Sequence, residues 1–313
     1  MSVGANIKKR RFELRMSQQE LADAMGYRTR STIAKIESGE NDVSQRKLQR
    51  FAEVLDTTVE ALISGTVLPS QPSAPVMMPG RGNRTAAVIL AGGKTGKNRQ
   101  NIPSQFINVH GKPIIVYCMD AYQAHPSVDD LYVVCLKGWE NIVRAYCSQY
   151  GITKLRGILT AGNSGMASLQ VALNHLRGHY GDDDLVIIQE ATRPQVTGET
   201  ISRLLQATAE KGSATICHSM DDYVQFDISG EGARYVDRST LIALQSPEAH
   251  SYRLMEEVFE KAGQRSHPLT ESCCTMLLYN LGYPINFIES SINNIKVSRE
   301  EDIAAFAALV KEG

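Results

Sequence analysis

The C-terminal two thirds of the chain alternates continuous apolar runs with amphipathic stretches. Apolar runs occupy residues 86–90, 131–136, 185–188 and 214–217. Continuous runs of this kind are typical of strands that are buried on both faces of a parallel sheet. Amphipathic stretches at 113–122, 168–176, 200–209 and 253–262 predict helices between them. The pattern predicts an open α/β domain with a mostly parallel sheet, whose ligands bind beyond the C-terminal strand ends.

The first 65 residues show helical spacing instead. Ser17 is a good N-cap and Glu20 completes a capping box. Gly26 ends that helix, and residues 31–37 predict a short helix with Ile33 and Ile36 facing inward. Two further helical stretches supply the core candidates Leu48, Phe51, Val54, Leu55, Leu62 and Ile63. Short helices with a glycine-containing turn after the second predict an all-α helix-turn-helix domain.

A proline-rich segment separates the two patterns. Residues 66–84, TVLPSQPSAPVMMPGRGNR, contain four prolines, two glycines and no acidic residue. Such a segment resists helix and strand and is typical of a semi-stiff linker. The predicted organisation is therefore a helical domain at 1–65, a linker at 66–84 and an α/β domain at 85–313.

The composition indicates a globular protein of the reducing cytoplasm. The chain is 42% hydrophobic and 21% charged, with a formal net charge of −1. We find neither a membrane-spanning apolar stretch nor a signal-peptide pattern, so we expect a cytoplasmic protein without membrane partners. The six cysteines lack C-x-x-C spacing and partner histidines. We interpret them as free thiols, with a metal site or disulfide framework as the alternatives.

The helical domain carries a specific motif. The stretch SQQELADAMGYRTRSTIAKIESGEND closely resembles the Cro/C1-type (XRE-like) helix-turn-helix family, and the match covers about residues 4–64. Within residues 1–35, eight Lys/Arg residues stand against three acidic ones, a +5 excess that suits duplex DNA. The alternative is a protein-binding or dimerising module with a solvated basic face. The DNA contacts that the resemblance implies come from Gln18, near a phosphate, and from Arg28, Thr29, Arg30, Ser31, Thr32 and Lys35 on the recognition helix.

A glycine-rich, basic loop follows the first predicted strand of the α/β domain. Gly92 and Gly93 precede Lys94, Lys97 and Arg99. Small residues let backbone N–H groups approach an anion, so the loop is a candidate phosphate site. It fits neither the P-loop nor the G-x-G-x-x-G pattern. The alternative is that the glycines only turn a tight corner between strand and helix.

Further segments resemble the motifs of one nucleotidyltransferase family. In chain order they read LAGGKTGKNRQNIPSQF, GKPIIVY, AGNSGMASLQVAL, IIQEATRP, RSTLIALQSPEAH and SSINNIKVSREEDI. They are similar to the cytidylyltransferases of 2-C-methyl-D-erythritol 4-phosphate and ribitol 5-phosphate. The resemblance implies a Rossmann-like nucleotidyltransferase fold, CTP and a sugar-alcohol phosphate as substrates, Mg²⁺ as cofactor, and a homodimer. In the implied reaction the alcohol phosphate attacks the α-phosphorus of CTP and pyrophosphate leaves.

The resemblance also implies roles for individual residues. Lys97, Lys296 and Arg238 would be catalytic, with Lys296 at the α-phosphate. Arg238 would bind the substrate phosphate, typically across a dimer interface, and Thr270 would stand beside that substrate. Glu190 would also hold the metal. The nucleotide-binding set would be Ala91, Gly92, Gly93, Lys94, Ser168, Glu190 and Arg193.

Several positions depart from the family pattern. Lys97 stands in place of an arginine and loses the guanidinium fork, and Ser104 stands in place of a lysine and loses the charge. Gln189-Glu190 replaces a His-Asp pair, while Gly165 and Glu271 replace an arginine and an aspartate. These changes leave open a weakened cytidylyltransferase with a DNA-binding head, or a transcriptional regulator that senses a nucleotide or alcohol phosphate. A pure dimerisation scaffold is a third hypothesis.

Overall fold

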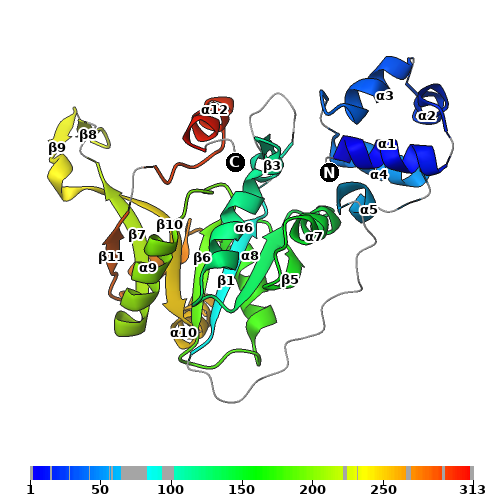
Figure 1. The fold of residues 1–313 in the computed structure, drawn as a ribbon. Helices are drawn as coiled ribbons and strands as arrows, with labels where there is room; N and C mark the ends of the chain where they lie inside the picture. Colours follow the sequence, from blue (N-terminus) through cyan, green and yellow to red (C-terminus); the bar gives the residue numbers. More distant parts are fainter. Residues whose placement is uncertain are drawn as a thin grey trace.

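A computed structural model describes residues 3–310, except 15, 28, 42, 56, 58, 65–82, 94–101, 221–223, 231, 266–268 and 291–292. A helical part at the N-terminus and a larger α/β part follow one another along the chain (Figure 1). Most of the predicted linker, together with Arg28, Lys94, Lys97 and Arg99, lies outside the described residues. Within them, no helix is long and apolar enough to cross a membrane.

The helical part consists of short helices around one core. They are α1 (Val3–Glu13), α2 (Gln18–Ala24), α3 (Arg30–Glu37), α4 (Gln45–Val54) and α5 (Val59–Ser64). The predicted capping box is present, because Ser17 Oγ accepts from Glu20 N at 3.2 Å and Glu20 Oε2 accepts from Ser17 N at 2.6 Å. Gly26 follows α2 with a φ of 76°, in the left-handed region that favours glycine. Of the predicted core residues, only Val54 is half-buried rather than buried.

A seven-stranded sheet forms the centre of the described α/β part, in the order β11-β7-β10-β6-β1-β4-β5. The predicted strands are β1 (Thr85–Ala91), β4 (Asp130–Cys135), β6 (Leu185–Glu190) and β7 (Ser213–Ser219). The sequence analysis missed β5 (Leu155–Thr160), β10 (Ile242–Ser251) and β11 (Phe287–Glu289). β10 runs antiparallel to β6 and β7, whereas the other pairs are parallel. The sheet is therefore mostly parallel, as predicted.

Helices cover both faces of this sheet. Ala87 and Ile89 of β1 pack with α6 (Ile114–Ala124), α7 (Glu140–Gln149) and α9 (Gly198–Lys211). Ala86 and Val88 point to the opposite face and pack with α8 (Gly165–Leu176), α10 (Tyr252–Gly263) and α11 (Cys274–Asn280). Alternate residues of a strand point to opposite faces, so one continuous apolar run supplies both layers.

Smaller elements extend from this core. A short ribbon of β2 (Asn108–Val109) and β3 (Lys112–Pro113) lies beside α12 (Glu300–Leu309), which buries Phe306. A separate hairpin of β8 (Gln225–Asp227) and β9 (Arg234–Val236) projects from the opposite end of the sheet (Figure 1). Single turns of 3-10 helix occur at η1 (Ser104–Phe106) and η2 (Arg238–Thr240). α5 packs against α7, which joins the helical part to the α/β part.

Candidate nucleotide site and DNA-reading surface

A cavity of about 730 Å³ opens at the C-terminal ends of β1 and β6. Its walls include Ala91, Gly92 and Gly93 after β1, and Glu190 at the end of β6. The loop before α8 and the extended segment that carries Lys296 complete it. Ligands of open α/β sheets bind at this edge, and the volume is that of an ordinary small-molecule site.

Packing explains the first glycine of the loop. A Cβ atom on Gly92 would lie 2.5 Å from Ala161 Cβ and 3.5 Å from Ser168 Oγ, so no larger residue fits there. Gly93 has open space around it. Gln105 closes the corner, because its Nε2 donates to Ala91 O at 2.8 Å and to Gly93 O at 3.0 Å. Gly92 therefore does serve a tight corner, while Gly93 leaves the backbone open toward the cavity.

The N-terminus of α8 forms the facing wall. Ser164 caps the helix by accepting from Ala167 N at 3.1 Å. Ser168 is buried, and its hydroxyl donates to Ser164 O at 2.8 Å and accepts from Gly162 N at 3.1 Å. The Ser168 hydroxyl thus holds the loop in shape at the cavity wall. The positive end of a helix dipole and its free N–H groups face the space where an anion could bind.

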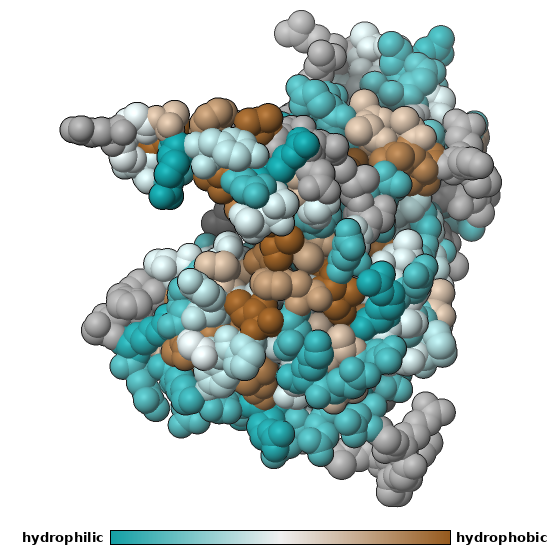
Figure 2. All heavy atoms as spheres, turned by 90° about the vertical axis from the view of Figure 1, so that its left-hand side faces the viewer, coloured by the Kyte–Doolittle hydropathy of each residue, from teal (hydrophilic) through white to brown (hydrophobic). Residues whose placement is uncertain are grey.

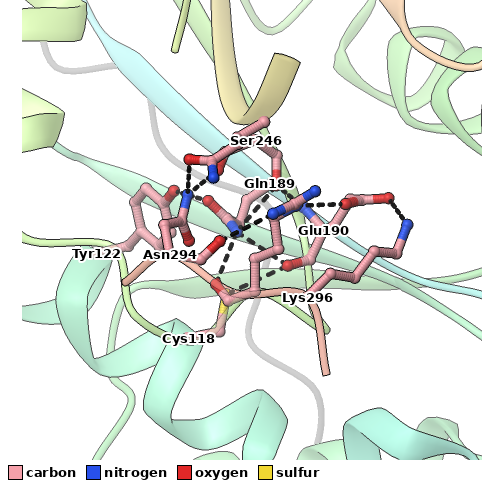
Figure 3. A network of polar contacts seen from close by, with 9 residues as sticks. Cys118, Tyr122, Gln189, Glu190, Ser246, Asn294 and Lys296 are labelled. Atoms are coloured by element: carbon pink, nitrogen blue, oxygen red, sulfur yellow. Dashed lines mark hydrogen bonds and ion pairs between the residues drawn. The ribbon is translucent and has the colours of Figure 1, made fainter. Parts of the chain in front are cut away.

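A carboxylate between two cations marks the charged side of the cavity (Figure 3). Glu190 Oε1 lies 2.5 Å from Lys296 Nζ, and Glu190 Oε2 lies 3.0 Å from Arg193 Nε. Arg193 also donates through Nη1 to Asn294 O at 2.8 Å. Lys296 is 46% exposed and Arg193 only 15%. Arg193 is therefore a fixed part of the wall, whereas Lys296 is exposed enough to turn toward a ligand.

A buried polar frame supports Glu190 from behind. Gln189 is fully buried, accepts from Tyr122 OH at 2.6 Å and donates to Arg193 O at 3.0 Å (Figure 3). Ser246 Oγ accepts from Glu190 N at 3.1 Å, and Asn294 Nδ2 donates to Ser246 O at 2.8 Å. These hydrogen bonds hold Gln189, Ser246 and Asn294 in one geometry. None of Tyr122, Ser246 and Asn294 was assigned a role from the sequence.

Glu248 forms a second buried carboxylate at the cavity wall. It accepts from Cys274 N at 2.9 Å, Thr275 N at 2.7 Å and Thr275 Oγ1 at 2.6 Å. Burial raises the pKa of Glu248, but its interactions with His250, Thr275 and Cys274 outweigh this and lower the pKa below 4.5. Glu248 is thus an ionised cap for α11 and is committed to structure.

The family model of 2-C-methyl-D-erythritol 4-phosphate cytidylyltransferase matches residues 85–312, and a helix-turn-helix family model matches residues 7–62. The chain belongs to the 2-C-methyl-D-erythritol 4-phosphate cytidylyltransferase family. The cytidylyltransferase domain thus covers the α/β part, and the helical part is a helix-turn-helix domain.

Two curated relatives illustrate the range of the family. A ribitol-5-phosphate cytidylyltransferase of Lacticaseibacillus paracasei is 28% identical over 228 residues, which is 72% of this chain and 97% of the relative. A 2-C-methyl-D-erythritol 4-phosphate cytidylyltransferase of Syntrophus aciditrophicus is 27% identical over 231 residues, 73% of this chain and 97% of the relative.

Solved structures show the same fold. The 4-diphosphocytidyl-2C-methyl-D-erythritol synthase of Anaerococcus prevotii superposes with a TM-score of 0.62 at 18% identity, over 72% of this chain and 96% of that chain. The 2-C-methyl-D-erythritol 4-phosphate cytidylyltransferase of Thermus thermophilus gives a TM-score of 0.57 at 21% identity, over 72% and 98%.

The structure brings most of the predicted nucleotide residues of the cytidylyltransferase domain together. The residues that line the cavity include Ala91, Gly92, Gly93, Ser168, Glu190, Arg193 and Lys296. The departures Ser104 and Gly165 line it too, and Ser104 is buried with its Oγ 3.5 Å from Ser298 O. Lys94 and Lys97 lie outside the described residues.

The predicted substrate residues lie elsewhere. Arg238 belongs to η2, next to the β8–β9 hairpin, and is not among the residues that line the cavity. Thr270 is exposed ahead of α11, where Ser272 and Cys273 line the cavity instead. A single chain therefore does not bring these two residues to the nucleotide cavity.

Helix α3 of the helix-turn-helix domain presents a polar face. Thr29, Arg30, Ser31 and Lys35 are exposed and Thr32 is half-buried, while Ile33 and Ile36 face the core. Arg28 lies outside the described residues. The exposed face therefore carries the side chains that the family resemblance assigns to base and phosphate contacts.

One basic residue was wrongly counted in the surface patch. Arg11 is buried, and its Nε and Nη2 donate to the two carboxylate oxygens of Glu37 at 2.6 and 3.0 Å. Gln18 Nε2 also donates to Glu37 Oε2, at 2.8 Å. Arg11 therefore joins α1 to α3 inside the domain, and the basic excess at the surface is smaller than the sequence count. Its basic neighbours Lys8, Lys9 and Arg10 gave no signal of this burial.

Proposed function

We propose that the cytidylyltransferase domain binds CTP in the cavity and transfers its cytidylyl group slowly to a sugar-alcohol phosphate. The observation that carries the proposal is the Lys296–Glu190–Arg193 cluster beside the open backbone at Gly93. A triphosphate needs cations and N–H donors on several sides at once. The cavity offers an ammonium, the N-terminus of α8 and the loop backbone.

Lys296 has the central chemical role in this proposal. When CTP enters, the ammonium leaves Glu190 Oε1 and turns to the α-phosphate, where negative charge grows as the alcohol phosphate attacks and pyrophosphate leaves. Because Arg193 is held between Glu190 and Asn294 O, it keeps the carboxylate in place after Lys296 turns away. Preorganised charge of this kind stabilises phosphoryl transition states.

The residues at the cavity fit Mg²⁺. Glu190 would hold the ion together with the phosphates of CTP, since Mg²⁺ usually binds one or two carboxylates plus substrate phosphates. A carboxylate has more lone pairs than the two that Lys296 and Arg193 use. When bound, Mg²⁺ supplies neutralisation of phosphate charge. Among the described residues no group of three or more His, Cys, Asp or Glu forms another metal site.

The proposed slowness rests on Ser104. This residue lines the cavity where relatives carry a lysine in the resemblance, and a buried hydroxyl cannot neutralise phosphate charge. Losing one preorganised contact of this type commonly costs ~10²–10³ in rate. The same observation favours the second candidate, a regulator in which CTP is sensed and not consumed.

We also propose that the helix-turn-helix domain binds duplex DNA through α3. The exposed side chains Arg30, Ser31 and Lys35 support it, because a polar and basic helix face can enter a major groove. Binding should weaken steeply with salt, since phosphate contacts release counterions.

We further propose a homodimer formed through the β8–β9 hairpin. Val224, Phe226, Ile228 and Tyr235 are each more than half exposed, and apolar side chains reach the surface of this face around a hollow (Figure 2). A second copy that covers them would place Arg238, which follows the hairpin in η2, at or near the dimer interface. Light scattering on the full chain tests this, and Phe226→Lys should convert the dimer to a monomer. A wild-type monomer at micromolar concentration would contradict it.

Pyrophosphate release tests the proposed enzymatic function. We expect slow release that requires both CTP and either ribitol 5-phosphate or 2-C-methyl-D-erythritol 4-phosphate, and that falls further in Lys296→Met. Release at ~1 s⁻¹ or faster, as in ordinary enzymes, would contradict the weakened site. Binding of CTP without release on any alcohol phosphate would support the regulator instead.

A further inference from the structure

Residues 102–106 lie between the nucleotide cavity and the DNA-binding domain. Ser104 lines the nucleotide cavity. Ile102, two residues before Ser104, lines a second cavity of about 620 Å³ between the domains. The other described residues that line this second cavity come from α3, the turn after it and the beginning of α4, namely Thr32, Ile36, Gly39, Glu40, Asn41, Ser44 and Lys47.

A buried aromatic pair makes a second connection. The rings of Phe106 and Trp139 stack with centroids 4.1 Å apart and planes 4° apart. Phe106 follows Gln105, whose amide holds the carbonyls of Ala91 and Gly93. Trp139 is the N-cap of α7, and α7 packs against α5 of the DNA-binding domain. The nucleotide corner is therefore continuous, through packed side chains, with the helix-turn-helix domain.

Buried hydrogen bonds inside the DNA-binding domain extend this connection from α5 to α3. Asn6 Nδ2 on α1 donates to Leu62 O at 3.1 Å and to Ile63 O at 3.2 Å, so α5 is fixed to α1. The Arg11–Glu37 pair then fixes α1 to α3. A displacement of α7 would reach the DNA-reading helix through contacts that are buried throughout.

We propose that nucleotide binding and DNA binding are energetically linked through the Ile102 and Phe106–Trp139 contacts. The inference rests on the proposed function of both domains. A duplex whose major groove receives α3 must pass a phosphate backbone beside the turn that follows α3, where Ile102 lies. A nucleotide bound at Ser104 contacts the same short stretch, residues 102–106, so each ligand changes the surroundings of the other.

The chain contains a natural reporter of this linkage. Trp139 is its single tryptophan, it is 8% exposed, and its ring rests on Phe106. Its fluorescence should change when CTP binds to the transferase cavity. The same signal should respond to duplex DNA, although α3 and Trp139 belong to different domains.

The test uses the full chain and a duplex that the protein itself selects from a randomised library. The dissociation constant of the labelled duplex is measured by anisotropy with and without saturating CTP, and that of CTP by calorimetry with and without saturating duplex. We expect each ligand to change the affinity for the other by about fivefold or more, with the same factor in both experiments, because linkage is reciprocal.

Two variants and a matched control locate the connection. Ile102→Ala and Phe106→Leu should leave the separate affinities unchanged and remove the linkage. The matched control is Phe259→Leu, the same substitution in α10 on the other face of the sheet. This variant should retain the linkage between the two ligands. If both ligands bind and the factor stays below about fivefold, the linkage is wrong and the proposed function stands. If CTP does not bind in the absence of duplex, or duplex does not bind in the absence of CTP, both the linkage and the proposed function are wrong.

Discussion

The Ser104→Lys variant tests why the transferase should be slow. Ser104 lies on the cavity wall beside Ser298, two residues from Lys296. A lysine at this position can therefore extend an ammonium into the space that we assign to the phosphates. If the missing charge is the main defect, it restores a contact worth ~2.7–4 kcal/mol in the transition state, or ~10²–10³ in rate.

The Ser104→Lys substitution should also change the stability of the protein. Ser104 is only 2% exposed, so a lysine must lie in the cavity and lose hydration whenever no nucleotide is bound. We expect the free energy of unfolding of the nucleotide-free protein to fall by about 0.5–3 kcal/mol. CTP should offset this loss in a thermal unfolding experiment, because the ammonium then has phosphate partners.

The assay is pyrophosphate release with saturating CTP and alcohol phosphate, together with a separate CTP titration. Ser104→Met is the matched control, since it adds a side chain of similar length without charge. The lysine variant should release pyrophosphate faster at nearly unchanged CTP affinity, and the methionine variant should not. An equal gain in both variants, or no gain in the lysine variant while CTP still binds, would refute the reasoning.

Three further predictions concern the helix-turn-helix domain and the segment before α11. Replacing Arg28, Arg30 and Lys35 together with alanine should abolish gel-shift binding while circular dichroism stays unchanged, and an unaltered gel-shift affinity would contradict DNA reading by α3. Arg11→Met should lower the stability of the helical domain by about 3–5 kcal/mol, measured by hydrogen exchange, because it leaves Glu37 buried without its ion-pair partner; a loss below ~1 kcal/mol would show that the pair is not needed. Burial alone would raise the pKa of Glu271 above its ordinary value of 4.5. Hydrogen bonds, including those from Asn280 and Arg265, have the larger effect and lower the pKa to about 2. The stabilising effect of Glu271 should thus be complete above pH 4.5 and disappear as the pH falls toward 2. The free energies of unfolding of wild type and Glu271→Gln, measured in urea, should therefore converge in acid. A difference that does not depend on pH would contradict this.

Local signals made much of the fold predictable. Ser17 and Glu20 lie three residues apart and form their capping box from neighbours in the chain. The continuous apolar run of β1 reflects burial on both faces, so it indicated a parallel central strand directly. β10 was missed because its sequence, IALQSPEAHS, mixes polar residues and a proline into an antiparallel strand.

Site residues were predictable where a motif named them. Lys296 lies far in sequence from Glu190 and Arg193, and the family motifs indicated all three residues. Tyr122 and Ser246 support the same carboxylate through Gln189 and the backbone of Glu190. Neither was assigned a role, although Ser246 lies within the motif RSTLIALQSPEAH. Arg11 shows the opposite error, since composition counts charges without showing which of them are buried and paired.

Calorimetric titration of the full chain with CTP in the presence of Mg²⁺ is the most direct test of the central claim. The account predicts saturable binding of one CTP per chain, with a lower affinity in Lys296→Met. The stoichiometry should remain one CTP per chain even when pyrophosphate release is negligible. The absence of binding at millimolar CTP would contradict the account, because the glycine loop would then be only a corner in the fold.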